Sequence, residues 1–128
     1  MYAKEAIYAY APDFSKGTLT KKEITFNRRI SDLISNMEKE GILPKGSSYN
    51  SFFIKDNVAN IGLSKDFGKG LKEALAKNKT NERLIVAALV NTLIEYYNVE
   101  KVFITVEKQI HETDDGRYNE PLGFFTFQ

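Results

Sequence analysis

The sequence predicts a two-layer α+β domain in which a mixed β-sheet carries helices mainly on one face. Apolar residues alternate with other residues over 4–12 and 58–64, which is typical of strands. Residues 28–40 and 82–97 instead repeat apolar side chains at helical spacing. Residues 100–108 return to strand character directly after the second helix. The predicted order of the main elements is therefore β-β-α-β-β-α-β.

The first half of the chain contains a predicted hairpin and a predicted helix. Gly17 supplies a turn between the strand at 4–12 and a second strand at 19–26. Asn27 is the expected N-cap of the helix over 28–40. Its apolar residues follow the i, i+3, i+4, i+7 spacing of a buried helix face and are Ile30, Leu33, Ile34 and Met37.

A second hairpin is predicted from residue 49 onward. The strand at 49–56 meets the strand at 58–64 through a short turn at Asp56-Asn57. A short helix is expected over 70–77, and Asn81 is the expected cap of the long helix that ends near Tyr97.

The C-terminal region offers two further strand signals. Asp114 to Arg117 reads as another hairpin turn, because Asp-Gly favours such turns. Residues 123–127 are expected either to return as a final strand or to fold over the second face of the sheet.

The long helix is apolar around most of its circumference. One sector is broadly apolar and consists of Ile85, Val86, Leu89, Leu93, Tyr96 and Tyr97. Leu84, Ala87 and Ile94 extend the apolar surface beyond this sector, which indicates burial on more than one side. Two explanations stay open: a neighbouring helix covers the extra side, or the side is a contact patch for another protein.

Composition limits the classes of protein to consider. A length of 128 residues fits a single domain spanning 1–128. The 18 lysines and arginines nearly balance the 17 acidic residues, so clustered charge for nucleic-acid binding is not expected. The absence of cysteine excludes disulfides and zinc-thiolate sites. No apolar run reaches the ~18 residues of a membrane span, so membrane contact is expected only through an anchor outside this chain.

No set of residues predicts catalysis, a cofactor or a metal. His111 is the only histidine, and no G-x-S-x-G nucleophile motif is present. The acidic stretch at 111–120 lacks the ligand spacing of an EF-hand. The glycines at 68 and 70 lack the spacing of a phosphate-binding loop. We therefore expect a protein that is not an enzyme.

Three stretches together resemble a known family. They are VANIGLSKDF at 58–67, the helix and strand of 82–108, and NEPLG at 119–123. Their pattern resembles the GerMN domain, which belongs to GerM-like sporulation and spore germination proteins. The matching positions are Tyr8, Pro12, Asp13, Ala59, Ile61, Leu63, Ser64, Phe67, Asn91, Thr92, Leu93, Glu95, Val99, Lys101, Val102, Ile104, Glu120, Pro121 and Leu122.

The resemblance implies a function as well as a fold. It implies a non-enzymatic interaction module of the bacterial cell envelope, located outside the cytoplasm. Proteins with this domain include membrane-anchored lipoproteins. It also implies a likeness to ring-building modules, which pack helices of one copy against the sheet of the next. The expected partners are further copies of the chain or other envelope and sporulation proteins.

Geometry suggests which residues would make such contacts. The outer side of the long helix supplies one candidate surface, formed by Leu84, Ala87, Asn91 and Ile94. The sheet face around Tyr8 and Tyr10 supplies the other.

The alternative function is a monomeric domain that binds a cell-wall glycan or peptide. Aromatic rings that could stack on such a ligand are Tyr8, Tyr10, Tyr49 and Tyr118.

Overall fold

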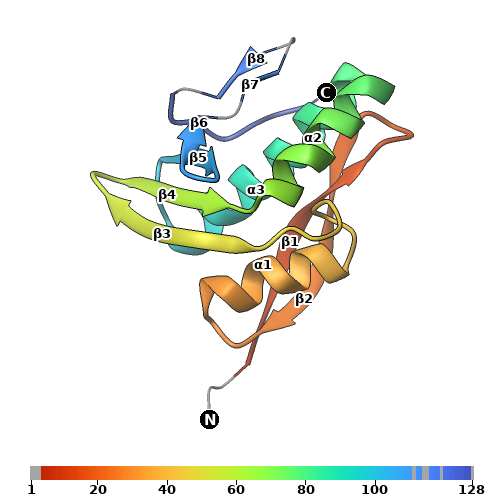
Figure 1. Cartoon of the computed structure of the whole chain (residues 1–128). Coiled ribbons are helices and arrows are strands. Elements are labelled where there is room, and N and C mark those ends of the chain that lie inside the picture. Colours follow the sequence, from red (N-terminus) through yellow and green to blue (C-terminus); the bar gives the residue numbers. More distant parts are fainter. Residues whose placement is uncertain (1–3, 111, 114–115, 119, 128) are drawn as a thin grey trace.

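The protein has an α+β fold, seen in a computed structural model that describes residues 4–110, 112–113, 116–118 and 120–127 (Figure 1). The predicted class is confirmed. In chain order the elements are β1 (Glu5–Asp13), β2 (Thr18–Phe26), α1 (Ile30–Lys39), β3 (Tyr49–Lys55), β4 (Val58–Leu63), α2 (Lys65–Lys77), α3 (Lys79–Tyr97), β5 (Lys101–Val106), β6 (Gln109–Ile110), β7 (Glu112–Thr113) and β8 (Gly116–Arg117).

The strands form separate sheets. β1 and β2 make a long antiparallel hairpin of their own, and β7 and β8 make a small second pair. The main sheet has the order β3-β4-β5-β6, in which β4 and β5 run parallel. A parallel pair needs a crossover connection, and α2 with α3 supplies it. The expected mixed sheet is therefore confirmed for β3 to β6, whereas the β1–β2 hairpin lies apart, on the other side of α3 (Figure 1).

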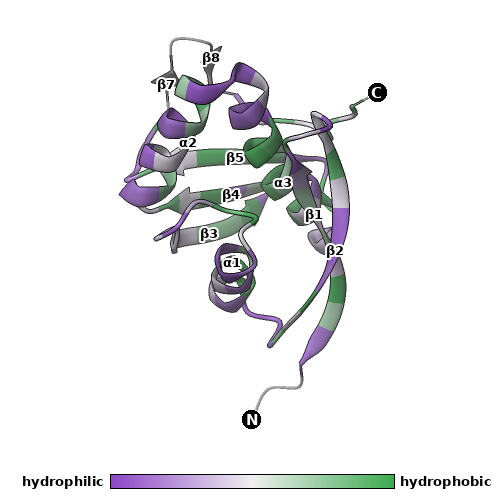
Figure 2. Cartoon of the chain, turned by 90° about the vertical axis from the view of Figure 1, so that its right-hand side faces the viewer, coloured by the Kyte–Doolittle hydropathy of each residue, from purple (hydrophilic) through white to green (hydrophobic). Residues whose placement is uncertain are grey.

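Helix α3 is enclosed by the rest of the chain. It contacts β1 and β2 on one side, β4 and β5 on another, and α2 on a third. Every residue from 84 to 93 is buried. Figure 2 accordingly shows hydrophobic colouring along α3, while α2 presents hydrophilic residues to the viewer. The predicted burial of this helix on more than one side is confirmed.

Thr92 joins α3 to the first hairpin. Its hydroxyl oxygen accepts a hydrogen bond of 2.9 Å from the backbone N–H of Tyr10. Tyr10 lies opposite Lys21 in the β1–β2 register, and its N–H points away from β2 toward the helix. At the free edge of β1, the side chain of Thr92 therefore supplies the hydrogen-bond acceptor that a third strand would otherwise supply. The hairpin of β1 and β2 accordingly packs against α3 at this edge.

Replacing Thr92 by valine should lower the free energy of unfolding by about 1–2 kcal/mol. The methyl group preserves the packing of this side chain, which is 2% exposed, but leaves the N–H of Tyr10 without its acceptor. Thr92→Ser keeps the hydroxyl and serves as the control in urea unfolding. Equal stability of the valine and serine variants would show that the hydrogen bond contributes nothing.

The C-terminal segment, residues 120–127, lies over α3 and the edge of β5. Asn91 binds the backbone of Phe125 twice, since its Nδ2 donates to the carbonyl at 2.9 Å and its Oδ1 accepts from the N–H at 2.8 Å. Val102 and Leu122 exchange backbone hydrogen bonds of 2.8 and 2.9 Å. Residues 123–127, all of them described, form no strand. The expected final strand is therefore absent from 123–127, and the side-chain amide of Asn91 on α3 binds this segment instead.

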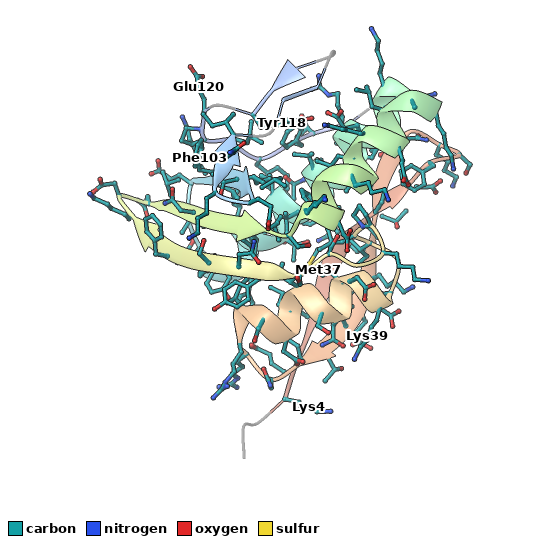
Figure 3. All side chains as sticks on the ribbon, in the orientation of Figure 1. Lys4, Met37, Lys39, Phe103, Tyr118 and Glu120 are labelled. Carbon is teal, nitrogen blue, oxygen red and sulfur yellow. The ribbon has the colours of Figure 1, made fainter. Side chains whose placement is uncertain are left out.

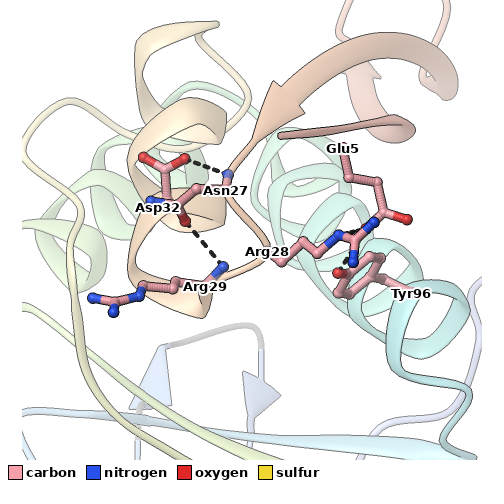
Figure 4. A network of polar contacts seen from close by, with 6 residues as sticks. All are labelled: Glu5, Asn27, Arg28, Arg29, Asp32 and Tyr96. Carbon is pink, nitrogen blue, oxygen red and sulfur yellow. Dashed lines mark hydrogen bonds and ion pairs between the residues drawn. The ribbon is translucent and has the colours of Figure 1, made fainter. Parts of the chain in front are cut away.

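Helix α1 begins two residues later than the sequence suggests. Arg29, not Asn27, occupies the N-cap position. The Asn27 side chain accepts a hydrogen bond from the Arg29 N–H, and the Asp32 carboxylate accepts one from the Asn27 N–H (Figure 4). The inner side of α1 carries the predicted residues Leu33, Ile34 and Met37, all buried, and Figure 3 shows Met37 between α1 and β3.

The boundaries of α3 follow local side-chain chemistry. Asn78, rather than the predicted Asn81, caps its start by accepting a hydrogen bond of 2.8 Å from the N–H of Thr80. Asn98 ends the helix in the left-handed conformation, with φ of 55°. Asparagine tolerates this conformation better than most residues, so Asn98 is well suited to end the helix.

Candidate functional site

The contact surface expected on α3 is not accessible in this chain. Leu84, Ala87 and Asn91 are fully buried, and Ile94 is partly buried against the core. Asn91 is occupied by the backbone of Phe125. The expectation is corrected in this respect, because the polar asparagine on the outer side binds the C-terminal segment of its own chain.

The two tyrosines of β1 differ in their accessibility. Tyr8 is 63% exposed. The hydroxyl of Tyr10 instead donates a hydrogen bond of 2.6 Å to Glu95, and its ring meets Phe124 edge-on with 5.6 Å between centroids. Burial, together with the hydrogen bond to Glu95, raises the pKa of Tyr10 to about 12. Tyr10 therefore joins β1 to α3 and the C-terminal segment, and only Tyr8 is free to meet a partner.

Buried tyrosines make the protein sensitive to alkaline pH. Burial also raises the pKa of Tyr97 to about 12. Because an unfolded tyrosine has a pKa of about 10, these groups stabilise the fold fully below pH 10, and the stabilisation is lost as pH rises through 12. We expect the free energy of unfolding to fall between pH 10 and 12, and to fall less in Tyr10→Phe. Identical urea-unfolding profiles against pH for the two proteins would contradict this role of Tyr10.

Exposed apolar residues gather at the end of the β3–β4 hairpin, which extends to the far left of the molecule in Figure 1. Phe53 is 56% exposed and Ile54 is 46% exposed. As neighbours in a strand they project to opposite faces of the sheet. Asp56 and Asn57 form the turn with φ of 52° and 63°, as a tight two-residue hairpin requires. We call residues 53–57 the hairpin tip.

The hairpin tip is held in place by the start of β5. The carbonyl of Asn57 accepts hydrogen bonds from the N–H groups of Glu100 and Lys101, at 2.9 and 3.3 Å. On the outer face, Phe53 lies in register with Asn60, which in turn lies in register with Phe103 of β5. The tip is therefore a fixed end of the main sheet.

A groove of about 440 Å³ lies on a different part of the surface. It is formed by the β1–β2 turn, the segment between α1 and β3, one side of α2 and the first turns of α3. We call it the Phe14 groove, after an aromatic residue that is 48% exposed. Its other lining residues are Gly41, Ile42, Leu43, Pro44, Lys45, Gly70, Glu73, Ala74, Lys77, Asn81 and Ile85.

The groove has the mixed chemistry of a binding site. Apolar side chains line it, and the exposed charges of Lys45, Glu73 and Lys77 stand beside them. Its volume falls within the range of roughly 300–1,000 Å³ that is usual for ligand pockets. A shallower depression of about 370 Å³ continues from it along α2 and shares Pro44, Lys45, Gly70 and Glu73.

Two further tyrosine hydroxyls in the described residues are bound to carboxylates of the same chain. The hydroxyl of Tyr118 donates to the carboxylate of Glu82, which is 1% exposed, and the hydroxyl of Tyr96 donates to Glu5 (Figures 3 and 4). No three carboxylate or histidine groups of the described part could hold a metal ion together. His111, Asp114, Asp115 and Asn119 lie outside the described residues.

Of the two exposed surfaces, the hairpin tip and the Phe14 groove, the sequence predicted only part of the hairpin tip. It placed the strand at 49–56 and the hairpin turn at Asp56-Asn57, and the structure has both. It did not find the Phe14 groove. Phe14 is followed by Ser15 and Lys16 in a polar turn, and nothing local shows that α2 and the 41–45 segment lie beside it.

Solved structures with the same fold are GerMN domains and a related protein. The first GerMN domain of the sporulation protein GerM from Bacillus subtilis is 20% identical, with a TM-score of 0.62 over 93% of this chain and 97% of that chain. A Clostridium perfringens protein inferred to be a lipoprotein is also 20% identical, with a TM-score of 0.58 over 94% and 87%. The tandem GerMN domains of the Bacillus subtilis protein match with 15% identity and a TM-score of 0.55, over 94% of this chain and 44% of theirs. The fold is thus that of a GerMN domain.

A comparison of the sequence with protein-family models identifies the family of this chain. Residues 7–111 match the family model Germane, described as sporulation and spore germination. The chain therefore belongs to this family. No curated protein sequence matches it. In the described part of the chain, no helix combines the length and the hydrophobicity that crossing a bilayer requires.

Proposed function

We propose that the chain is a non-enzymatic interaction module of the bacterial cell envelope, which acts by associating with protein. The observation that carries this proposal is the hairpin tip, where Phe53 and Ile54 expose apolar area on two faces of one narrow structure. Single exposed apolar residues are common, so what favours a contact here is that two large ones are adjacent at a fixed end of the sheet. The preformed turn lowers the entropy cost of binding there.

The location outside the cytoplasm belongs to the same proposal. It is supported by the family description of sporulation and spore germination and by the likeness to the inferred lipoprotein of Clostridium perfringens. Contact with the membrane would come from an anchor outside this chain. The partner is another copy of the chain or another envelope or sporulation protein.

A protein partner agrees better with the structure than a glycan held by tyrosines. Tyr8 and Tyr49 are exposed but belong to different sheets. Tyr10 and Tyr118 are hydrogen-bonded to Glu95 and Glu82. The four rings therefore do not form one stacking platform.

Site-specific photocrosslinking tests the proposal. A photoreactive phenylalanine analogue at position 53 should give a light-dependent covalent adduct with protein in cells of the native bacterium. The same analogue at Lys72, an exposed position on α2 outside the groove, is the matched control. An adduct that forms from position 53 and at least several-fold less from position 72 supports association through the tip. Absence of any protein adduct from position 53 would overturn it.

A further inference from the structure

We infer that α3 and the edge of β5 form a binding site for an extended, apolar segment of another protein. The C-terminal segment of the chain, residues 120–127, occupies this site and is displaced when the partner binds. The site uses other residues than the hairpin tip, so the inference goes beyond the proposed function.

The site holds the C-terminal segment by its backbone. Leu122 exchanges two backbone hydrogen bonds with Val102 of β5, at 2.8 and 2.9 Å. At Phe125, the side-chain amide of Asn91 accepts from the N–H at 2.8 Å and donates to the carbonyl at 2.9 Å. Because every residue other than proline carries the same backbone groups, these contacts select an extended main chain rather than one particular sequence. Another segment in the same conformation can make them.

Apolar side chains supply the rest of the contact. Leu122 and Phe125 are partly buried and pack against the core. The ring of Phe124 meets the ring of Tyr10 on β1 edge-on. No charged residue occurs from 121 to 127. A partner segment therefore needs two apolar side chains at the spacing of Leu122 and Phe125, with no charge between them.

The side of α3 beneath the segment is apolar. Leu84 and Ala87 lie on the same side of the helix as Asn91, because the three residues repeat at helical spacing. Leu84 and Ala87 are completely buried, yet neither belongs to the group of buried residues that forms the main core. Exposing this side to water is unfavourable, so a segment that leaves it has to be replaced by another.

The C-terminal segment is held more lightly than the rest of the fold. Residues 123–127 form no helix or strand, and Phe124 is 45% exposed. Segments with few buried contacts open at a much lower free energy than the core of a domain does. A competing segment can therefore enter the site while the rest of the domain stays folded.

Another protein is a better competitor for the site than a second copy of this chain. The attached segment acts at an effective concentration that is roughly millimolar for short flexible connections. A second copy offers the same segment with the same contacts, so it displaces the attached one only at comparable protein concentrations. A segment of another protein can carry side chains that fit the site more closely.

Fluorescence anisotropy with a labelled peptide of residues 120–127, EPLGFFTF, tests the site. The wild-type chain is compared with a variant whose own segment is weakened by Leu122→Ser and Phe125→Ser. Because the attached competitor then occupies the site less often, this variant should bind the peptide at least about tenfold more tightly than wild type. Circular dichroism verifies that the variant is folded. A folded variant that gains no affinity would overturn the inference.

Methylation of the peptide backbone tests recognition by Asn91 without altering the protein. A methyl group on the nitrogen of Phe125 removes the N–H that donates to Asn91, so it should weaken binding at least about fivefold. The same group on the nitrogen of Phe127, beyond both anchored residues, is the matched control. Equal affinity of the two methylated peptides would contradict recognition through the backbone.

Nuclear magnetic resonance of the wild-type chain shows whether the peptide displaces the attached segment. Excess unlabelled peptide, at about millimolar concentration, should move the amide signals of Leu122 and Phe125 in the labelled chain toward those of an unbound segment. This measurement needs no substitution, so it decides the question even where the serine variant does not fold. Peptide that leaves both amide signals in place would overturn the inference.

Sedimentation velocity of the same samples distinguishes the two kinds of partner. Wild type should stay monomeric at micromolar concentration, with or without the peptide. Dimers that the peptide dissociates would assign the site to a second copy and overturn the assignment to another protein. The photocrosslinking at position 53 tests the hairpin tip independently of these outcomes.

Discussion

Asn91→Asp should lower the free energy of unfolding by about 3–5 kcal/mol near neutral pH. The carboxylate can still accept the hydrogen bond from the N–H of Phe125, but it cannot donate to the carbonyl that Nδ2 now binds at 2.9 Å. The site is completely buried, so a negative charge would lie beside a carbonyl oxygen without compensation. Urea unfolding at pH 7 measures the loss.

The pH dependence of the stability of Asn91→Asp shows whether the loss comes from the buried negative charge or from a change in side-chain packing. A protonated aspartic acid can donate to the carbonyl of Phe125, so the variant should recover stability relative to wild type as pH falls. Asn60→Asp is the matched control, because Asn60 is only partly buried and its amide bonds locally to Val58. A loss below about 1 kcal/mol for Asn91→Asp, or one equal to that of Asn60→Asp, would contradict the anchoring role.

Gly70→Val should lower the free energy of unfolding by about 3 kcal/mol. A Cβ atom at Gly70 would lie 2.1 Å from the Cβ of Pro44 and 2.5 Å from its Cγ. The 41–45 segment would have to move away from α2, which would also reshape the Phe14 groove. Ala76→Val, at an exposed position of the same helix, is the control and should cost well under 1 kcal/mol.

A double-mutant cycle with Pro44→Gly tests the cause of this loss. Glycine at position 44 lacks both the Cβ and the Cγ that a side chain at position 70 would meet, so Gly70→Val should cost clearly less in the Pro44→Gly background. Interaction energies between residues in contact are usually about 0.5–3 kcal/mol. Strict additivity of the two changes would show that the clash with Pro44 is not the reason.

Local patterns predict the elements of this fold well. Strand alternation located β1 and β4, and the spacing of Leu33, Ile34 and Met37 located the inner side of α1. The continuous apolar surface of α3 predicted burial on several sides, as the structure has it. These features depend on residues that are neighbours in the chain.

Contacts between distant residues are the part that local patterns did not predict. Asn91 and Thr92 are adjacent polar residues in a helix, and periodicity alone makes them marginal or outward-facing. They face two different segments, the backbone of Phe125 and the free edge of β1. A polar residue that replaces a missing strand partner cannot be told from an exposed one before the topology is known. This is why the sequence left both explanations open for the outer side of α3, coverage by the rest of the chain and a contact patch for another protein.

The two candidate surfaces also differ in whether they depend on local or on distant residues. The tip is a local hairpin, and its turn was predicted at Asp56-Asn57. The groove depends on four segments of the chain, which contribute Phe14, Pro44, Gly70 and Ile85 among its lining residues.

Photocrosslinking from the hairpin tip tests the central claim of association with protein most directly. A photoreactive phenylalanine analogue at position 53 should give a light-dependent adduct with protein, and the same analogue at Lys72 should give at least several-fold less. Absence of any protein adduct from position 53 would contradict the account.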